Sequence, residues 1–220
     1  DFEMMIGEVT QTQFLAVTGY NPSSTVSDDL PVHNINWHEA AHFSNLLSEI
    51  EGMSGCYDCT GSGSSALCDY SEVDIYSCEG YRLPTEAEWE YCARGGEEHL
   101  YAGSNNIDEV AWYYGNSGGK THGVGEKKGN GFGLYDMSGN VWEWVWDSSS
   151  VDENGDFSRE SMYTDAERTN PVVETASSFR MLRGGGWCFS EQDARASFRF
   201  RDIAPKRTDY IGFRLVSANI

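Results

Sequence analysis

The sequence predicts one α+β domain of 220 residues, and three observations lead to that prediction. Windows with helical periodicity occur in the first half of the chain. From about Leu100 onward the chain changes to short pieces rich in Gly, Asn, Ser, Trp and Tyr, which are typical of short strands joined by irregular loops. The hydrophobic content of 39% and aromatic content of 13% can fill a core, and no linker or repeat divides the chain.

Local signals place three helices. A short helix is predicted within 10–19, because a threonine can cap its start and a glycine ends it. Apolar residues at 3.6-residue spacing predict the clearest helix over 37–50. Thr85 followed by Glu88 is a capping box, and it predicts a third helix that reaches Arg94.

Six cysteines indicate an oxidising compartment. Four of them lie in a loop-rich insert at about 53–80, namely Cys56, Cys59, Cys68 and Cys78. They can form two disulfides, with three possible connectivities, or a zinc site with four thiolate ligands. Only Cys56 and Cys59 have the spacing of a zinc knuckle, so disulfides are favoured. Cys92 is expected in the core, and Cys188 has no evident mate.

The formal net charge of -20 argues against nucleic acid and anionic lipid as partners, because both require clustered Lys and Arg. No run of about 18 apolar residues is present that could span a membrane. The chain begins at Asp1 rather than Met, so the lack of a signal peptide carries no prediction.

His38-Glu39-Ala40-Ala41-His42 has the zinc-protease pattern H-E-x-x-H on a predicted helix. A short motif of this kind matches easily by chance, and no third ligand is identifiable. We therefore interpret it as part of a packed helix.

Several longer sequence motifs occur in a characteristic order along the chain. They are Gly7-Glu8-Val9-Thr10, Pro31 to Trp37, Arg82 to Glu90, Gly133 to Trp144, Arg183-Gly184-Gly185-Gly186-Trp187, and Ile211-Gly212-Phe213-Arg214. Together they resemble the formylglycine-generating-enzyme (sulfatase-modifying factor) superfamily over nearly the whole chain. The resemblance implies a C-type-lectin-like fold, in which two main helices flank a twisted antiparallel sheet and much of the chain is irregular loop.

The enzymatic branches of that family require ligands that this chain lacks. The oxidase branch binds copper through two cysteines, five residues apart, just after the Arg-Gly-Gly phrase. Phe189 and Ala194 occupy those places here, and Cys188 comes one position too early. An iron-dependent branch takes three histidines from a separate domain. Neither copper nor iron is expected, and the resemblance implies no enzymatic activity.

A third branch, the variable proteins of diversity-generating retroelements, carries a variable region at its C-terminus. The resemblance places that region at 183–216, between two fixed phrases. Adenine mutation there yields residues such as Phe, Ser, Tyr, Cys, Ile, Asp and Gly. Lys206 is outside that set, and Gly186 stands where relatives often carry Ser. The expected ligand-binding face is Gly186, Trp187, Cys188, Phe189, Ser190, Asp193, Phe198, Phe200, Asp202, Ile203, Lys206, Thr208, Asp209 and Tyr210.

Two alternatives remain open within this region. The aromatic residues can be core residues of closing strands, and the alternation in 198–201 resembles a short strand with two faces. They can also line a binding surface, where stiff aromatic and adaptable polar side chains combine as in antibody paratopes. The four arginines in and beside the region are expected to brace the scaffold, namely Arg183, Arg195, Arg199 and Arg214.

The resemblance also implies a structural calcium ion. Its ligands are the side chain of Asp136, the carbonyls of Gly139 and Val141, and the carboxylate of Glu143. The alternative is that Asp136 caps a turn and Glu143 pairs with an arginine.

We therefore expect a non-enzymatic, surface-displayed binding protein with a retroelement-diversified C-terminal face. The expected partner is a protein or a cell-surface glycan, without nucleic acid, and the chain is expected to be a monomer. A lipid anchor outside this chain would attach it as an outer-membrane lipoprotein. The alternatives are a metal-dependent oxidase-type enzyme of the family and an undiversified extracytoplasmic recognition module.

Overall fold

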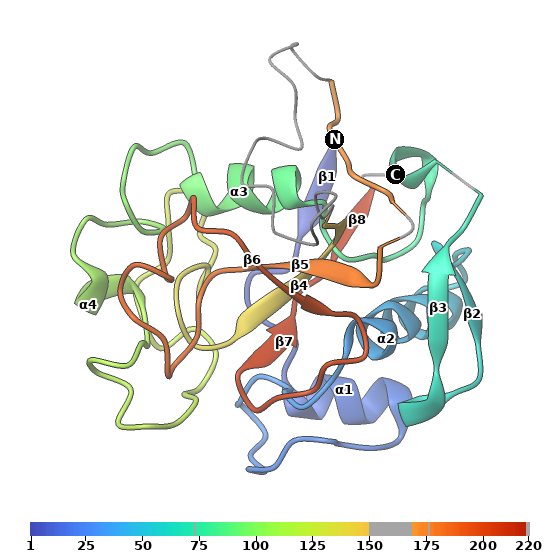
Figure 1. Ribbon diagram of the computed structural model, residues 1–220, viewed down its shortest axis with the longest axis horizontal. Helices are drawn as coiled ribbons and strands as arrows, with labels where there is room; N and C mark the ends of the chain where they lie inside the picture. Colours follow the sequence, from blue (N-terminus) through green and yellow to red (C-terminus); the bar gives the residue numbers. More distant parts are fainter. Residues whose placement is uncertain (73, 150–168, 176, 219–220) are drawn as a thin grey trace.

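A four-stranded sheet forms the centre of the computed structural model, which describes residues 1–72, 74–149, 169–175 and 177–218 (Figure 1). The strand order is β6-β5-β4-β7, where the strands are β4 (Trp142–Ser148), β5 (Phe179–Arg183), β6 (Phe200–Ile203) and β7 (Ile211–Phe213). The expected antiparallel pairing is confirmed for β4, β5 and β6. It is wrong for β7, which runs parallel to β4, because the loop 204–210 carries the chain to the opposite edge of the sheet.

The two faces of this sheet are covered by different helices. Alternate residues of a strand point to opposite faces, so Trp144 and Trp146 pack with α1 and α2 in one apolar cluster. Val145, between them, packs in a second cluster with α3. The indole of Trp37 in α2 donates to the Val145 carbonyl at 2.9 Å, which ties the first cluster to the sheet. In Figure 1 α3 accordingly lies on one side of the sheet and α1 and α2 on the other.

All three predicted helices are confirmed: α1 (Gln11–Thr18), α2 (Trp37–Ile50) and α3 (Glu86–Arg94). Each begins with a capping box, in which the cap side chain and the third helical side chain satisfy each other's backbone N–H groups. A single short turn, α4 (Ile107–Val110), was not predicted.

The cysteine-rich insert is a β-hairpin packed against α2. Its strands are β2 (Tyr57–Thr60) and β3 (Leu67–Tyr70), and two short 3-10 turns accompany them, η1 (Gly63–Ser65) and η2 (Ile75–Ser77). The disulfides are Cys56–Cys78 and Cys59–Cys68. This confirms the disulfide alternative over a four-thiolate zinc site and indicates an extracytoplasmic protein.

A second small sheet brings the two ends of the described chain together. β1 (Phe2–Met4) pairs antiparallel with β8 (Val216–Ala218), beside the start of α3 (Figure 1). Among the described residues no helix is both long and apolar enough to cross a bilayer.

Candidate functional site

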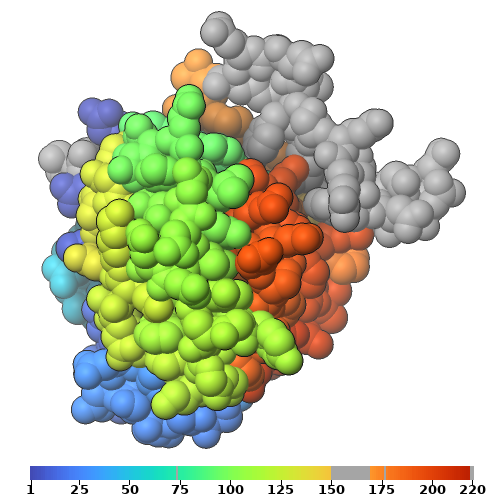
Figure 2. Space-filling view, turned by 90° about the vertical axis from the view of Figure 1, so that its left-hand side faces the viewer, coloured from blue at the N-terminus to red at the C-terminus, as the bar shows by residue number. Residues whose placement is uncertain are grey.

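The segment 183–216 begins and ends in the core and reaches the surface between. Arg183 and Arg214 are fully buried, and so are the glycines 184–186 and the strand β7. The residues between these buried ends include exposed side chains, among them Ser190 and Asp209. Figure 2 shows the segment in orange and red on one face of the molecule, next to green residues that precede β4.

The buried ends accept only glycine at two positions. Gly185 has φ +80°, and a Cβ there would lie 2.9 Å from the backbone Cα of Ala194. A Cβ on Gly212 would lie 2.6 Å from the carbonyl oxygen of Val32. The backbone of the segment is therefore held in place independently of its exposed side chains.

Arg183 orders the loop that leads into β6. Its guanidinium donates to the carbonyls of Ala196 and Phe198, each at 2.8 Å, and pairs with Glu90 of α3 at 2.6 Å. Arg199 pairs with Glu86 at the first turn of the same helix. The bracing role predicted for Arg183 and Arg199 is confirmed by these contacts.

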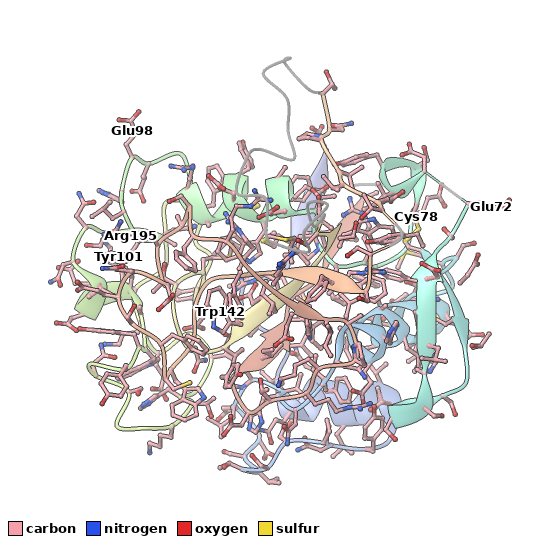
Figure 3. The ribbon with its side chains drawn as sticks, in the orientation of Figure 1. Glu72, Cys78, Glu98, Tyr101, Trp142 and Arg195 are labelled. Carbon is pink, nitrogen blue, oxygen red and sulfur yellow. A yellow bond between two sulfur atoms is a disulfide. The ribbon has the colours of Figure 1, made fainter. Side chains whose placement is uncertain are left out.

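The bracing role predicted for Arg195 is wrong, because its side chain is exposed. Arg195 lines an open hollow of about 620 Å³ on this face, and the other lining residues are Asp193, Ser197, Phe198, Arg199, Phe200 and Arg201. Figure 3 labels Arg195 among the loops on the same side of the molecule as Tyr101. Sequence analysis did not place Ser197 and Arg201 in the site, although the alternation over 198–201 contained a signal.

Five aromatic rings form a continuous cluster beneath this hollow. Trp142 of β4 is fully buried, and its ring centroid lies 5.2 Å from that of Phe200, 5.5 Å from Phe189 and 6.1 Å from Phe198. Tyr210 packs edge-on against Phe189 at 5.0 Å. Phe200 is 36% exposed, whereas the other three aromatic side chains from the segment are half-buried. The core and surface alternatives thus both apply, with Trp142 as the core and the segment's rings as its outer layer.

The remaining residues predicted for the face differ in exposure. Ile203 is 41% exposed, and only Gly186 is buried. The Asp193 carboxylate accepts from the Ser190 hydroxyl at 2.6 Å, and the Trp187 indole donates to the Asp209 carbonyl at 3.1 Å. Half-buried side chains complete the set, at Trp187, Cys188, Asp193, Asp202, Lys206 and Thr208.

One exposed aromatic residue outside the predicted segment lies in a loop that is hydrogen-bonded to the segment. Tyr114 is 77% exposed, and its backbone N–H donates to the carbonyl of Phe189 at 2.9 Å. The Ser117 hydroxyl, nearby in the chain, donates to the carbonyl of Trp187 at 2.8 Å. The sequence of this loop has no periodicity, so only the three-dimensional structure shows that it lies beside the segment.

Two of the four residues expected to hold calcium, Glu143 and Asp136, accept hydrogen bonds from protein groups. The Glu143 carboxylate accepts two bonds from the buried Arg214, at 2.7 and 2.8 Å, and one from the Trp89 indole at 2.7 Å. Asp136 accepts from the backbone N–H of Gly125 at 2.7 Å. These contacts match the alternative in which Glu143 pairs with an arginine. Because Arg214 and Trp89 already contact the Glu143 carboxylate, we derive no role for a calcium ion, and calcium binding stays a prediction.

The buried side chains around Glu143 include more acidic than basic groups. Glu8 is buried beside Asp136 and Glu143, and burial, with these two carboxylates, raises its pKa well above the ordinary value. Burial raises the pKa of Asp136 to about 6, although the Gly125 N–H and Arg214 oppose that shift. Arg214 is the cation that faces all three acids.

Replacing Asp136 with Asn is therefore expected to stabilise the protein at high pH. The folded-state pKa of about 6 exceeds the unfolded value of 3.8, so folding stability falls as pH rises through that interval. The expected gain from Asp136→Asn is about 3 kcal/mol at pH 8 and near zero at pH 4. Asn also tolerates the φ of +58° at this position. Urea denaturation of both proteins at the two pH values, with and without calcium, measures this; a calcium-dependent loss of stability in the variant would contradict it.

The two positions that hold copper-binding cysteines in the oxidase branch carry apolar side chains in this protein. Phe189 packs on Trp142, and Ala194 is buried beneath Gly185. Cys188 is a free, half-buried thiol, and burial, with the nearby Asp209, raises its pKa to about 11. The thiol is therefore protonated at neutral pH.

The H-E-x-x-H residues are engaged in packing the helix. Glu39 is buried, caps α2 through the Asn36 N–H at 2.9 Å, and pairs with Arg207 at 2.7 Å. His38 contacts the backbone of Cys68 at 3.0 Å. Glu39 would be the general base of a metalloprotease, but here it is occupied by these structural contacts. This agrees with our interpretation of the motif as part of a packed helix.

Known proteins with similar sequences include enzymes as well as other proteins. The chain is 33% identical to "Chaperone protein LppX" of Paenibacillus barcinonensis, over 90% of this chain and 73% of that protein. It is 34% identical to the formylglycine-generating enzyme of Mycobacterium tuberculosis, over 63% of this chain but only 51% of the enzyme.

Among solved structures, Treponema denticola variable protein 1 is highly similar. It superposes with a TM-score of 0.83 and 32% identity, over 99% of this chain and 84% of that one. The expected C-type-lectin-like fold and the resemblance to a variable protein are confirmed by this match. Residues 1–219 match the family profile of the sulfatase-modifying factor enzyme 1-like domain, and the chain therefore belongs to that family.

Proposed function

We propose that this protein is a non-enzymatic ligand-binding protein whose C-terminal segment is a diversified binding face. One observation carries the proposal: the ends of segment 183–216 are locked in the core, whereas its middle forms a surface of aromatic and polar side chains. Such a design permits many side-chain combinations on one backbone. The likeness to a variable protein over nearly the whole chain supports the same function.

The composition of the face favours a macromolecular partner. Phe200 supplies exposed apolar area, and Tyr114 adds a stiff ring with a polar end. Asp193 and Arg195 offer polar contacts at the hollow. A protein or a cell-surface glycan presents the mixed apolar and hydrogen-bonding surface that such a face contacts. Nucleic acid is disfavoured by the net charge of -20.

Display at the cell surface is part of the proposal. The two disulfides indicate an oxidising compartment. A lipid anchor attached outside this chain would keep the face available to other cells or molecules, as in an outer-membrane lipoprotein.

Sequencing of the flanking locus tests diversification directly. We expect a near-copy of the stretch encoding 183–216 close to a reverse transcriptase gene, differing from it almost only at adenines. If no such copy exists, diversification is wrong, and the protein is an undiversified recognition module with the same face.

A copper titration tests the enzymatic alternative, because the family contains formylglycine-generating enzymes. We expect no stoichiometric copper binding, since Phe189 and Ala194 stand at the ligand positions. Tight binding of one copper ion per chain at Cys188 would contradict the non-enzymatic proposal.

A further inference from the structure

A second group of metal-binding side chains lies away from the binding face, under the cysteine-rich hairpin. A ring nitrogen of His42 and the sulfurs of Cys59 and Cys68 all lie within 4.8 Å of one another. The two sulfurs are joined in a disulfide. The His42 Nδ1 atom is buried, and among the described residues it has no hydrogen-bond partner. An imidazole nitrogen without a partner is unusual in a buried position and is available to a ligand.

The position of His42 over the hairpin is held by its neighbours on α2. One turn before it, the Nδ1 atom of His38 lies 3.0 Å from the carbonyl oxygen and 3.2 Å from the backbone nitrogen of Cys68. One turn after it, the Asn45 amide donates to the Tyr57 carbonyl at 2.7 Å. Figure 1 shows α2 running beside the hairpin. The imidazole is thereby fixed next to the two sulfurs.

Opening the Cys59–Cys68 disulfide would leave the hairpin in place. The hydroxyl of Tyr57 accepts from the Leu83 N–H, and that of Tyr70 donates to the Trp146 carbonyl, each at 3.0 Å. The Cys56–Cys78 disulfide, whose cysteines are 1% and 5% exposed, anchors the base of the insert. Cys59 is partly exposed and sits directly opposite Cys68 in the strand register, so a soluble dithiol can reach this bond first.

We propose that reduction of Cys59–Cys68 creates a zinc site whose ligands are the two thiolates and the imidazole of His42. A dithiol reductant donates two electrons, becomes a cyclic disulfide, and leaves two thiols. Zn²⁺ then displaces one proton from each thiol and binds the His42 nitrogen, with water in the fourth position.

The surroundings suit this ligand set. The Asn45 amide lies 3.6 Å from the Cys59 sulfur, where its N–H can stabilise a thiolate. A soft sulfur pair with one imidazole favours zinc over magnesium or calcium.

The test uses the whole chain, titrated with Zn²⁺ and, as a spectroscopic probe, Co²⁺. Before reduction we expect no thiolate-to-cobalt absorption. After mild dithiol treatment, with alkylation and peptide mapping to confirm that Cys59–Cys68 has opened, we expect one equivalent of metal and a thiolate–cobalt band.

Two variants and a control make the result specific. His42→Gln is expected to weaken zinc binding at least about 10-fold, whereas His99→Gln, outside the site, should leave it unchanged. The double variant Cys59→Ser with Cys68→Ser should bind none. The proposal is overturned if the reduced protein binds no metal, or if either site variant binds as the parent does. Neither outcome bears on the binding face, which shares none of these residues.

Discussion

Replacing Glu143 with Ala should destabilise the protein by about 3–5 kcal/mol. Both partners of the Glu143–Arg214 ion pair are 0% exposed, and the variant would leave a buried guanidinium without its main acceptor. The Trp89 indole would lose its acceptor as well. The midpoint of urea denaturation measures the loss, with Glu49→Ala on the exposed side of α2 as the control.

A double variant separates the pair from general damage to the core. Glu143→Leu combined with Arg214→Met removes both charges and keeps apolar volume, so it should be less destabilised than Glu143→Ala alone below pH 6, where Asp136, which also faces Arg214, is protonated. If Glu143→Ala costs less than about 1 kcal/mol, Glu143 is not the main acceptor of the buried Arg214 guanidinium.

Local features of the fold could be predicted because their causes lie within a few residues. Thr85 and Glu88 are three positions apart and satisfy each other's backbone groups, so the start of α3 is visible in the sequence. Disulfides in the insert could be predicted from the number and spacing of its cysteines, but their pairing could not, because three connectivities were open until the hairpin placed Cys59 opposite Cys68. The rest of the architecture could be predicted from the long sequence motifs that indicate the family.

Contacts between distant parts of the chain could not be predicted in this way. Glu143 and Arg214 are 71 residues apart, and either could have met another partner or a metal ion. The direction of β7 depends on where the loop 204–210 leads, which no local pattern specifies. Tyr114 joins the face only because its loop pairs with the backbone of Phe189.

Because Trp142 belongs to the scaffold and Phe200 to the face, truncating these neighbouring rings should lower the free energy of unfolding by very different amounts. Trp142 is fully buried beneath the face, and Trp142→Ala should cost about 3–5 kcal/mol. Phe200 contacts the same indole at 5.2 Å but is 36% exposed, and Phe200→Ala should cost about 1 kcal/mol or less. Ile203→Ala, at 41% exposure, should behave similarly.

This contrast bears directly on whether the segment can vary. A surface whose residues are exchanged at random must leave the free energy of unfolding nearly unchanged at its exposed positions, because typical proteins have only about 5–15 kcal/mol in reserve. Urea denaturation of the three variants, with Leu15→Ala at the exposed Leu15 of α1 as a matched control, measures that tolerance. Losses at Phe200 and Ile203 as large as that at Trp142 would show that these side chains belong to the core, and the binding face would then have to lie elsewhere.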